Sequence, residues 1–171
     1  MKKHVLLLLI FILIVPKVGF GQVEKYKSVF TLNFIRYIGW PEDAKTGDFV
    51  IGVLRHDKIA ELLASQSSGK KFGHQNVVIK SFKSVDDVSN CQVLYVSSSI
   101  NFSRHAETLL SKIGKTALVV TESEGATKHG AVINFVVRDQ TLKFEIDNAN
   151  AQKYGLSISS KLSEMTAAIQ K

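Results

Sequence analysis

The chain has 171 residues, of which 45% are hydrophobic and 22% are charged, so it is long enough for an ordinary folded domain with its own core. Its formal net charge is +7, and the lysines are scattered rather than clustered. This pattern is typical of a solvated surface, or of affinity for an acidic partner or an anionic membrane face. Together with the export signal described next, it argues against nucleic acid as a partner.

Residues 1–21 are predicted to form a secretory signal peptide. Two lysines near the start are followed by an unbroken apolar run over residues 5–15, and two glycines precede a cleavage site ahead of Gln22. The run is shorter than the roughly 20 residues of a membrane span, which disfavours the alternative of an uncleaved anchor. The leader carries three lysines and no acid, so its removal lowers the net charge from +7 to +4. We therefore expect an exported protein with a single domain, residues 22–171.

Cys91 is the only cysteine in the chain. An intramolecular disulfide is therefore impossible, although an exported protein meets conditions that permit one. Because Cys91 lies at the start of a predicted strand, we interpret it as a small buried hydrophobic residue. An intermolecular disulfide is the alternative.

Residues 26–40 predict a helix that is apolar on two faces. At about 100° per residue, four aromatic side chains fall within one stripe: Tyr26, Phe30, Phe34 and Tyr37. Leu32 and Ile35 fall on the opposite side. Pro41 restricts Trp40 to an extended conformation, so the helix is expected to end there.

The second apolar face of this helix needs a cover of its own. A contiguous exposed apolar surface usually marks an interaction site, which suggests a homodimer or a partner interface. Burial of the same face under the C-terminal helix, through Leu162, Met165 and Ile169, is an equally weighted alternative. The candidate interface residues are Leu32, Ile35, Arg36 and Trp40.

Helices and strands alternate along the rest of the chain. Strands are predicted at residues 48–54, 76–82, 92–99 and 116–122, helices at 58–66, 103–115, 148–156 and 159–171, and a hairpin of two strands at 131–146. Strands without polar interruption that alternate with helices indicate a mainly parallel sheet covered on both sides. We predict a three-layer α/β sandwich of Rossmann-like or flavodoxin-like build, with an antiparallel hairpin at its C-terminal end.

No pattern of catalytic or metal-binding residues emerges from the sequence. The histidines after the leader lack the spacing of zinc motifs, no glycine-rich dinucleotide loop follows the first strand, and no Gly-x-Ser-x-Gly elbow occurs. Three serines, residues 97–99, end a strand where open α/β sheets hold ligands, although a plain turn is the commoner explanation. We therefore predict no catalytic residue, metal or cofactor, and a binding or regulatory module follows by elimination.

Polar residues among the C-terminal elements are the candidates for a small-ligand pocket: Asn134, Glu145, Asp147 and Lys161. Glu145 lies between Phe144 and Ile146 on a predicted strand and faces away from them. We prefer a structural ion pair of Glu145 with Lys161 or Arg36. A pocket for a small polar molecule at the strand ends is the sharper alternative.

Several stretches, in order along the chain, resemble the YfiR-like family of exported bacterial proteins. They are FTLNFIRYIGWPE, NCQVLYVS, and a segment from TES-EG through GAVINFVVRDQTLKFEIDNANAQKYGLSISSKLSEM. These stretches resemble four features of the family. The features are an aromatic helix that ends on Trp-Pro, a mid-chain strand with a cysteine, a Gly-x-Ile-Asn-Phe strand and a Phe-Glu-Ile-Asn strand. The resemblance covers essentially the whole chain after the leader.

The resemblance implies a periplasmic negative regulator of cyclic-di-GMP signalling. Such a protein holds the periplasmic sensory domain of an inner-membrane diguanylate cyclase inactive, and related domains serve as the input of sensor kinases. A small-ligand-binding input domain is therefore the first alternative, and an enzyme of unrecognised type is the second. The best-known members resemble redox-sensitive regulators with two disulfides. Here only Cys91 matches, so a disulfide switch is not expected. Asp147 and Ala126 also depart from the family pattern.

Overall fold

A computed structural model describes residues 20–169 of the protein, and the side chains of residues 21–166. The predicted signal peptide, apart from Phe20 and Gly21, lies outside the described residues, and so does the side chain of Ile169. The elements, with η marking a 3-10 helix, are α1 (Phe20–Arg36), β1 (Ile38–Gly39), η1 (Glu42–Lys45), β2 (Phe49–Leu54), α2 (Asp57–Ser67), β3 (Lys71–Phe72), β4 (Gln75–Phe82), β5 (Val93–Val96), α3 (Phe102–Lys112), β6 (Leu118–Thr121), η2 (Ala126–His129), β7 (Ile133–Arg138), β8 (Thr141–Ile146), α4 (Asn148–Lys153), β9 (Ser157–Ile158) and α5 (Ser160–Ile169).

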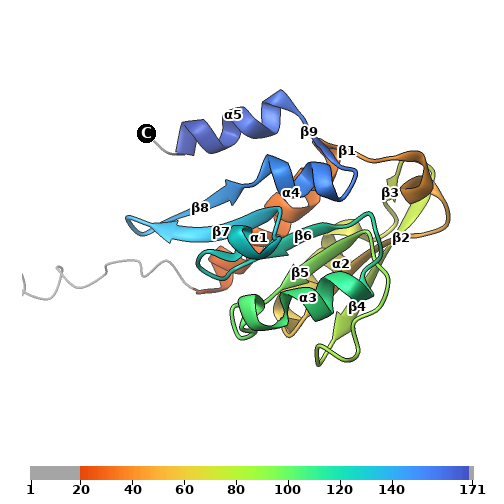
Figure 1. The fold of residues 1–171 in the computed structure, drawn as a ribbon, viewed down its shortest axis with the longest axis horizontal. Helices are drawn as coiled ribbons and strands as arrows, with labels where there is room; N and C mark the ends of the chain where they lie inside the picture. The colour runs from red at the N-terminus through yellow and green to blue at the C-terminus, as the bar shows by residue number, and fades with distance from the viewer. Residues whose placement is uncertain (1–19, 170–171) are drawn as a thin grey trace, which may run out of the picture.

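Seven strands form one sheet in the order β3-β4-β2-β5-β6-β7-β8. The five strands from β4 to β7 are parallel neighbours, whereas β3 and β8 pair antiparallel at the two edges. The parallel strands follow the strand order of flavodoxin-like folds. The chain first adds β4 on one side of β2 and then adds β5, β6 and β7 on the other side, so the topological switch point lies between β2 and β5. The predicted three-layer α/β sandwich, mainly parallel with an antiparallel C-terminal hairpin, is confirmed (Figure 1).

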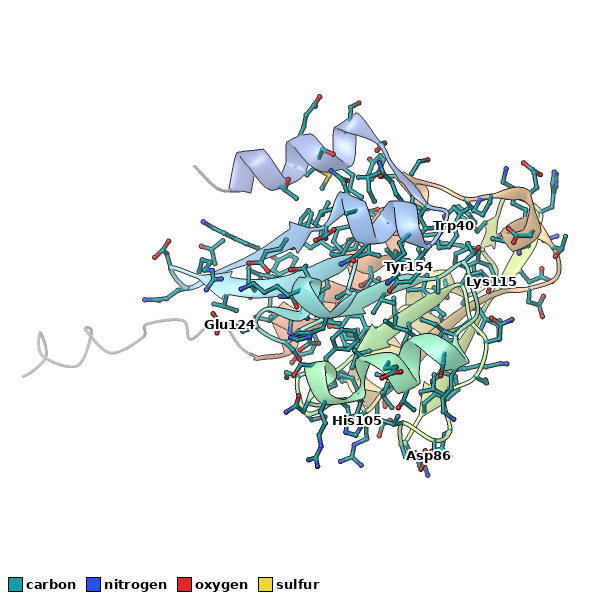
Figure 2. All side chains as sticks on the ribbon, in the orientation of Figure 1. Trp40, Asp86, His105, Lys115, Glu124 and Tyr154 are labelled. Carbon is teal, nitrogen blue, oxygen red and sulfur yellow. The ribbon has the colours of Figure 1, made fainter. Side chains whose placement is uncertain are left out.

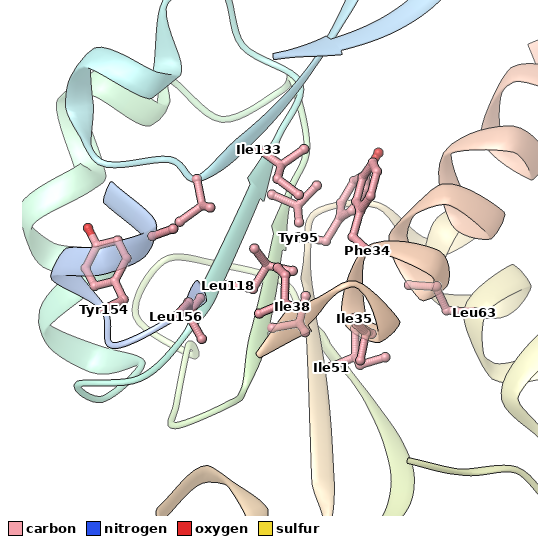
Figure 3. Packing of buried hydrophobic residues seen from close by; sticks show 14 of the residues in the cluster. Phe34, Ile35, Ile38, Ile51, Leu63, Tyr95, Leu118, Ile133, Tyr154 and Leu156 are labelled. Carbon is pink, nitrogen blue, oxygen red and sulfur yellow. The ribbon is translucent and has the colours of Figure 1, made fainter. Parts of the chain in front are cut away.

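Successive side chains of each strand point to opposite sides of the sheet, so the apolar strands present side chains on both faces. Helices cover both faces. Ile51, Tyr95 and Leu118 belong to the cluster under α1 and α2, whereas Leu94 and Val119 belong to the cluster under α3. Figure 1 shows α1 and α2 behind the sheet and α3 in front of it. Figure 3 shows how side chains from the helices meet those of the strands in the larger cluster.

The first helix ends earlier than the sequence predicts. The expected range was 26–40, but α1 ends at Arg36, and β1 pairs antiparallel with β9. The amide of Ser159 also donates to the carbonyl oxygen of Tyr37, at 3.0 Å. This pairing with a segment about 120 residues later takes residues 38 and 39 out of the helix, a tertiary override that local propensity does not reveal.

The last helix, α5, follows β8 along the edge of the sheet (Figure 1). Leu162 is buried and Met165 packs against the larger cluster, so part of the predicted apolar face of this helix is used in packing. Within residues 20–169, no helix has both the length and the hydropathy required to cross a membrane.

Candidate functional site at the carboxyl edge of the sheet

The carboxyl ends of β2, β5, β6 and β7 lie at one edge of the sheet, which is where open α/β sheets bind ligands. A cavity of about 310 Å³ opens there between α1, the end of β6 and the β7–β8 hairpin. Its lining residues are Lys27, Ser98, Glu122, Glu124, Phe135, Val136, Val137, Arg138 and Leu142. In Figure 2, Glu124 marks this edge, and Trp40 lies toward the opposite end of the molecule.

Glu122, directly after β6, is the centre of a polar cluster at the wall of the cavity. The ammonium group of Lys27 lies 2.8 Å from one carboxylate oxygen, and the hydroxyl of Tyr95 donates to the other. His56 Nε2 lies 3.7 Å from that second oxygen. The Lys27 and Glu122 side chains are only 13% and 7% exposed. Four segments that are distant in sequence therefore meet on one nearly buried carboxylate.

The environment of Tyr95 keeps its phenol protonated. Burial raises the pKa of Tyr95 well above its usual value, and the adjacent Glu122 carboxylate raises it further. The phenol is thus a neutral donor to Glu122, and Glu122 in turn is held by Lys27. The three side chains therefore hold one another in a fixed orientation at the wall of the cavity.

The mouth of the cavity combines opposite charges with an apolar side. A guanidinium nitrogen of Arg138 lies 3.9 Å from Glu124, and both side chains are substantially exposed. Val137 is 63% exposed, and Phe135 and Leu142 continue the apolar side. A second hollow of about 480 Å³ shares Ser98, Glu122 and Glu124 with the first.

The predicted polar-pocket residues do not converge on one point. Asn134 and Glu145 are brought together, with the Asn134 amide 3.2 Å from the Glu145 carboxylate. Asp147 instead caps α4 by accepting from the backbone N–H of Asn150 at 2.8 Å. Lys161 places its ammonium group 5.3 Å from the centre of an aromatic ring, that of Tyr37.

The predicted ion-pair partner of Glu145 was wrong. Arg138, and neither Lys161 nor Arg36, lies 3.4 Å from its carboxylate. The hairpin register places Asn134 opposite Glu145, and Arg138, four residues along the same strand, points to the same face. The other side of Asn134 accepts from the buried hydroxyl of Thr121 at 2.7 Å. This network ties β6, β7 and β8 together on the α3 side of the sheet.

The second apolar face of α1 is covered in part within the subunit by α2, an arrangement that neither sequence alternative included. Ile35 is 3% exposed, Leu32 is half-buried and Arg36 is exposed. Ser28, also buried in α1, accepts a 2.8 Å hydrogen bond from Gln66 of α2. The interface hypothesis was therefore wrong for Ile35, because α1 packs against both the sheet and α2.

Trp40 is likewise an anchor in the core rather than a surface side chain. It is 7% exposed, its indole nitrogen donates to the Ile35 carbonyl at 3.1 Å, and its ring meets Phe49 edge-on at 5.0 Å. The expectation that Trp40 belongs to an exposed interface is therefore wrong, since the extended segment after α1 turns it inward.

A family model described as YfiR/HmsC-like matches residues 24–166. The chain belongs to the YfiR/HmsC-like family. No curated protein matches the chain significantly. The family is known as one of periplasmic regulators of cyclic-di-GMP signalling, and the match extends from the first turns of α1 into α5.

The cysteine of this YfiR/HmsC-like chain lies in the interior. Cys91 is a free, buried thiol among residues 20–169, which agrees with its interpretation as a small hydrophobic residue. Burial is the main cause that raises its pKa to about 12, partly offset by a hydrogen bond to the backbone of Gly52. A thiol of this kind stays protonated at neutral pH and reacts slowly.

Lys27, His56, Tyr95 and Glu122 are the site residues that the sequence reasoning missed. His56 and Glu122 carry the detectable signal, because each polar side chain follows shortly after a buried parallel strand and so must lie at the carboxyl edge. No such signal exists for Lys27 or Tyr95. One is a helical lysine among many lysines, and the other is an aromatic residue in an apolar strand.

Proposed function

We propose that this protein is an exported, periplasmic negative regulator that binds the periplasmic part of an inner-membrane signalling protein, such as a diguanylate cyclase. The observation that carries the proposal is the YfiR/HmsC-like match over residues 24–166. The signal-peptide pattern in residues 1–21 supports export.

Deletion of the gene tests the regulatory part of the proposal. We expect cellular cyclic-di-GMP to rise in the deletion strain and to return to its original level on complementation. The periplasmic domain of a membrane cyclase or kinase encoded beside the gene should also bind the purified protein. An unchanged cyclic-di-GMP level, together with no binding to that domain, would contradict the proposal.

Export is tested separately on the full-length chain. We expect the protein in the periplasmic fraction with an N-terminus at Gln22, as determined by sequencing of the purified product. Retention in the membrane with the first residues intact would instead support the uncleaved anchor.

A second candidate function is a small-ligand-binding input domain, and the cavity of about 310 Å³ is the observation that favours it. Its wall offers Lys27 and Glu122, and its mouth offers Arg138 and apolar side chains, a combination that suits small molecules with polar and apolar parts. A thermal-shift screen of amino acids and nucleotides tests it. A stabilising compound whose effect disappears in Glu122→Gln would support the cavity as its site.

A homodimer also remains part of the proposal. Among the described side chains of α1, Tyr26 and Val29 are large apolar residues that remain exposed, at 49% and 40%. Size-exclusion chromatography with light scattering of the Tyr26→Glu variant tests whether this end of α1 joins two copies. A wild-type monomer at all concentrations would exclude the dimer.

A further inference from the structure

A groove lies between α1 and the C-terminal end of α2. Its main hollow has a volume of about 330 Å³ and is lined by Lys25, Val29, Leu32, Arg36, Gln66 and Lys70 among others. The α1 members are three or four residues apart, so they form one stripe along the helix. A smaller hollow of about 50 Å³ shares Leu32, Arg36 and Lys70 and adds Lys71. We call these two hollows together the α1–α2 groove.

Every charged side chain in the α1–α2 groove is positive. The cations are Lys25, Arg36, Lys70 and Lys71, and among the side chains of residues 21–166 no carboxylate lines either hollow. All four side chains are exposed, and none forms an ion pair in the part of the chain that the structure describes. Other surface cations do have partners, as Lys45 has Glu42. The groove therefore carries a local excess of positive charge that the described chain does not neutralise.

The floor of the groove is apolar and held in place from below. Val29 is 40% exposed and Leu32 is half-buried, so both present apolar surface between the cations. Beneath them, Ile35 is buried in the core, and the hydrogen bond between Gln66 and Ser28 holds the two helices together. A preformed apolar floor lowers the entropic cost of binding.

We propose that the α1–α2 groove docks an acidic amphipathic segment of the membrane signalling protein that this regulator binds. The inference rests on the proposed function and adds the surface and the chemistry of the partner. An apolar ridge on the segment would contact Val29 and Leu32, and flanking carboxylates would face the cations, as in helix-in-groove recognition. Charge complementarity selects this occupant, and the concave, partly recessed floor favours a protein segment over a lipid surface.

A peptide of known composition tests the groove without requiring the partner's identity. The probe is a fluorescent amphipathic helix of about 18 residues, or about five turns, with leucines on one face and glutamates on both flanks. We expect Arg36→Glu combined with Lys70→Glu to weaken its binding about tenfold or more, since like charges replace complementary ones. Added salt should weaken wild-type binding as well. A peptide with lysines in place of the glutamates should not bind.

The matched control makes the same charge change on the other face of the sheet. Arg104→Glu combined with Lys115→Glu reverses one arginine within α3 and one lysine shortly after it, both exposed. Figure 1 shows α3, and Figure 2 labels Lys115. Binding should then change by less than about twofold. Equal losses in both variants would overturn the proposal, and thermal melts of each variant verify folding.

A second probe is the periplasmic domain of a membrane cyclase or kinase that is encoded beside the gene. If wild type binds this domain and the Arg36→Glu, Lys70→Glu variant binds it equally well, the groove proposal is overturned while the proposed function stands. If wild type does not bind it and deletion of the gene leaves cyclic-di-GMP unchanged, the proposed function fails, and the peptide result still decides the groove. If the Arg36→Glu, Lys70→Glu variant binds the domain normally but no longer binds phosphatidylglycerol vesicles, the groove is a membrane site and the proposal is overturned. If the variant binds the domain normally but no longer forms a dimer, the groove contacts a second copy and the proposal is likewise overturned.

Discussion

The ammonium group of Lys27 lies 2.8 Å from the carboxylate of Glu122, a residue 95 positions later in the chain. This contact joins the first helix to the carboxyl end of β6. The same carboxylate accepts from Tyr95 of β5, so one side chain connects three elements. Because both members of the pair are nearly buried, the contact fixes the orientation of both side chains at the wall of the cavity.

Removal of one member of this pair should destabilise the fold strongly. Lys27→Met leaves the Glu122 charge nearly buried without its cation, and we expect the free energy of unfolding to fall by about 3 kcal/mol. Urea unfolding at neutral pH measures the change. As a comparison, Lys58→Met removes only an exposed pair with Glu61 and should cost less than about 1 kcal/mol.

The double variant Lys27→Met, Glu122→Gln distinguishes the interaction energy of the pair from the contribution that each side chain makes by packing. Its loss of stability should be smaller than the sum of the two single losses, because no unpaired charge remains. Strict additivity in the double-mutant cycle would show that the two groups do not interact in the folded protein.

Cys91 should resist thiol reagents in the native protein. Burial raises its pKa to about 12, so almost no thiolate is present at neutral pH, and the sulfur is shielded from solvent. Labelling with a thiol-reactive chromophore should be slow until denaturant is added and then fast. Rapid labelling without denaturant, or an intermolecular disulfide between folded subunits, would contradict the buried position.

Stability should decline at alkaline pH because of Cys91 and Tyr95. The pKa of Cys91 rises from 9.0 to about 12 on folding, so the unfolded chain loses this proton first. Its contribution is complete below pH 9.0 and is lost as the pH approaches 12, at about 1.4 kcal/mol per pH unit. The pKa of Tyr95 is also raised, from 10.0, which extends the decline above pH 10. The free energy of unfolding, measured with urea between pH 8 and 11, should fall less steeply with pH in Cys91→Ala than in wild type. An equal fall with pH in the two proteins would refute the assignment.

The turn of the C-terminal hairpin offers a stabilising substitution. Asp139 and Gln140 have φ values of 51° and 60° between the paired residues Arg138 and Thr141, a two-residue turn of the kind that favours glycine at its second position. Gln140→Gly should raise the free energy of unfolding by about 0.5–1 kcal/mol, because it relieves a left-handed conformation. Gln140→Ala keeps the strain and should give no gain, so equal effects of the two variants would exclude this explanation.

The strands were predictable because each buried strand is a short apolar run between polar turns. Residues 48–54 and 116–122 predicted β2 and β6 to within a few residues, and their alternation with helices indicated the parallel sheet. The end of α1 was not predictable, because residues 38 and 39 leave the helix to pair with β9. The cover over Ile35 was not predictable either, since sequence periodicity shows an apolar face but not which element packs on it.

The sequence by itself determined the fold class, the family and the interior position of Cys91. These properties depend on local patterns of apolar residues and on motifs that occur in a fixed order. Only the tertiary structure decided which side chains meet. It places Lys27, Tyr95 and Glu122 together at one cavity. It also pairs Glu145 with Arg138, and it buries Ile35 and Trp40 within one subunit. Contacts of this kind require packing between segments far apart in the chain, and no local pattern encodes them.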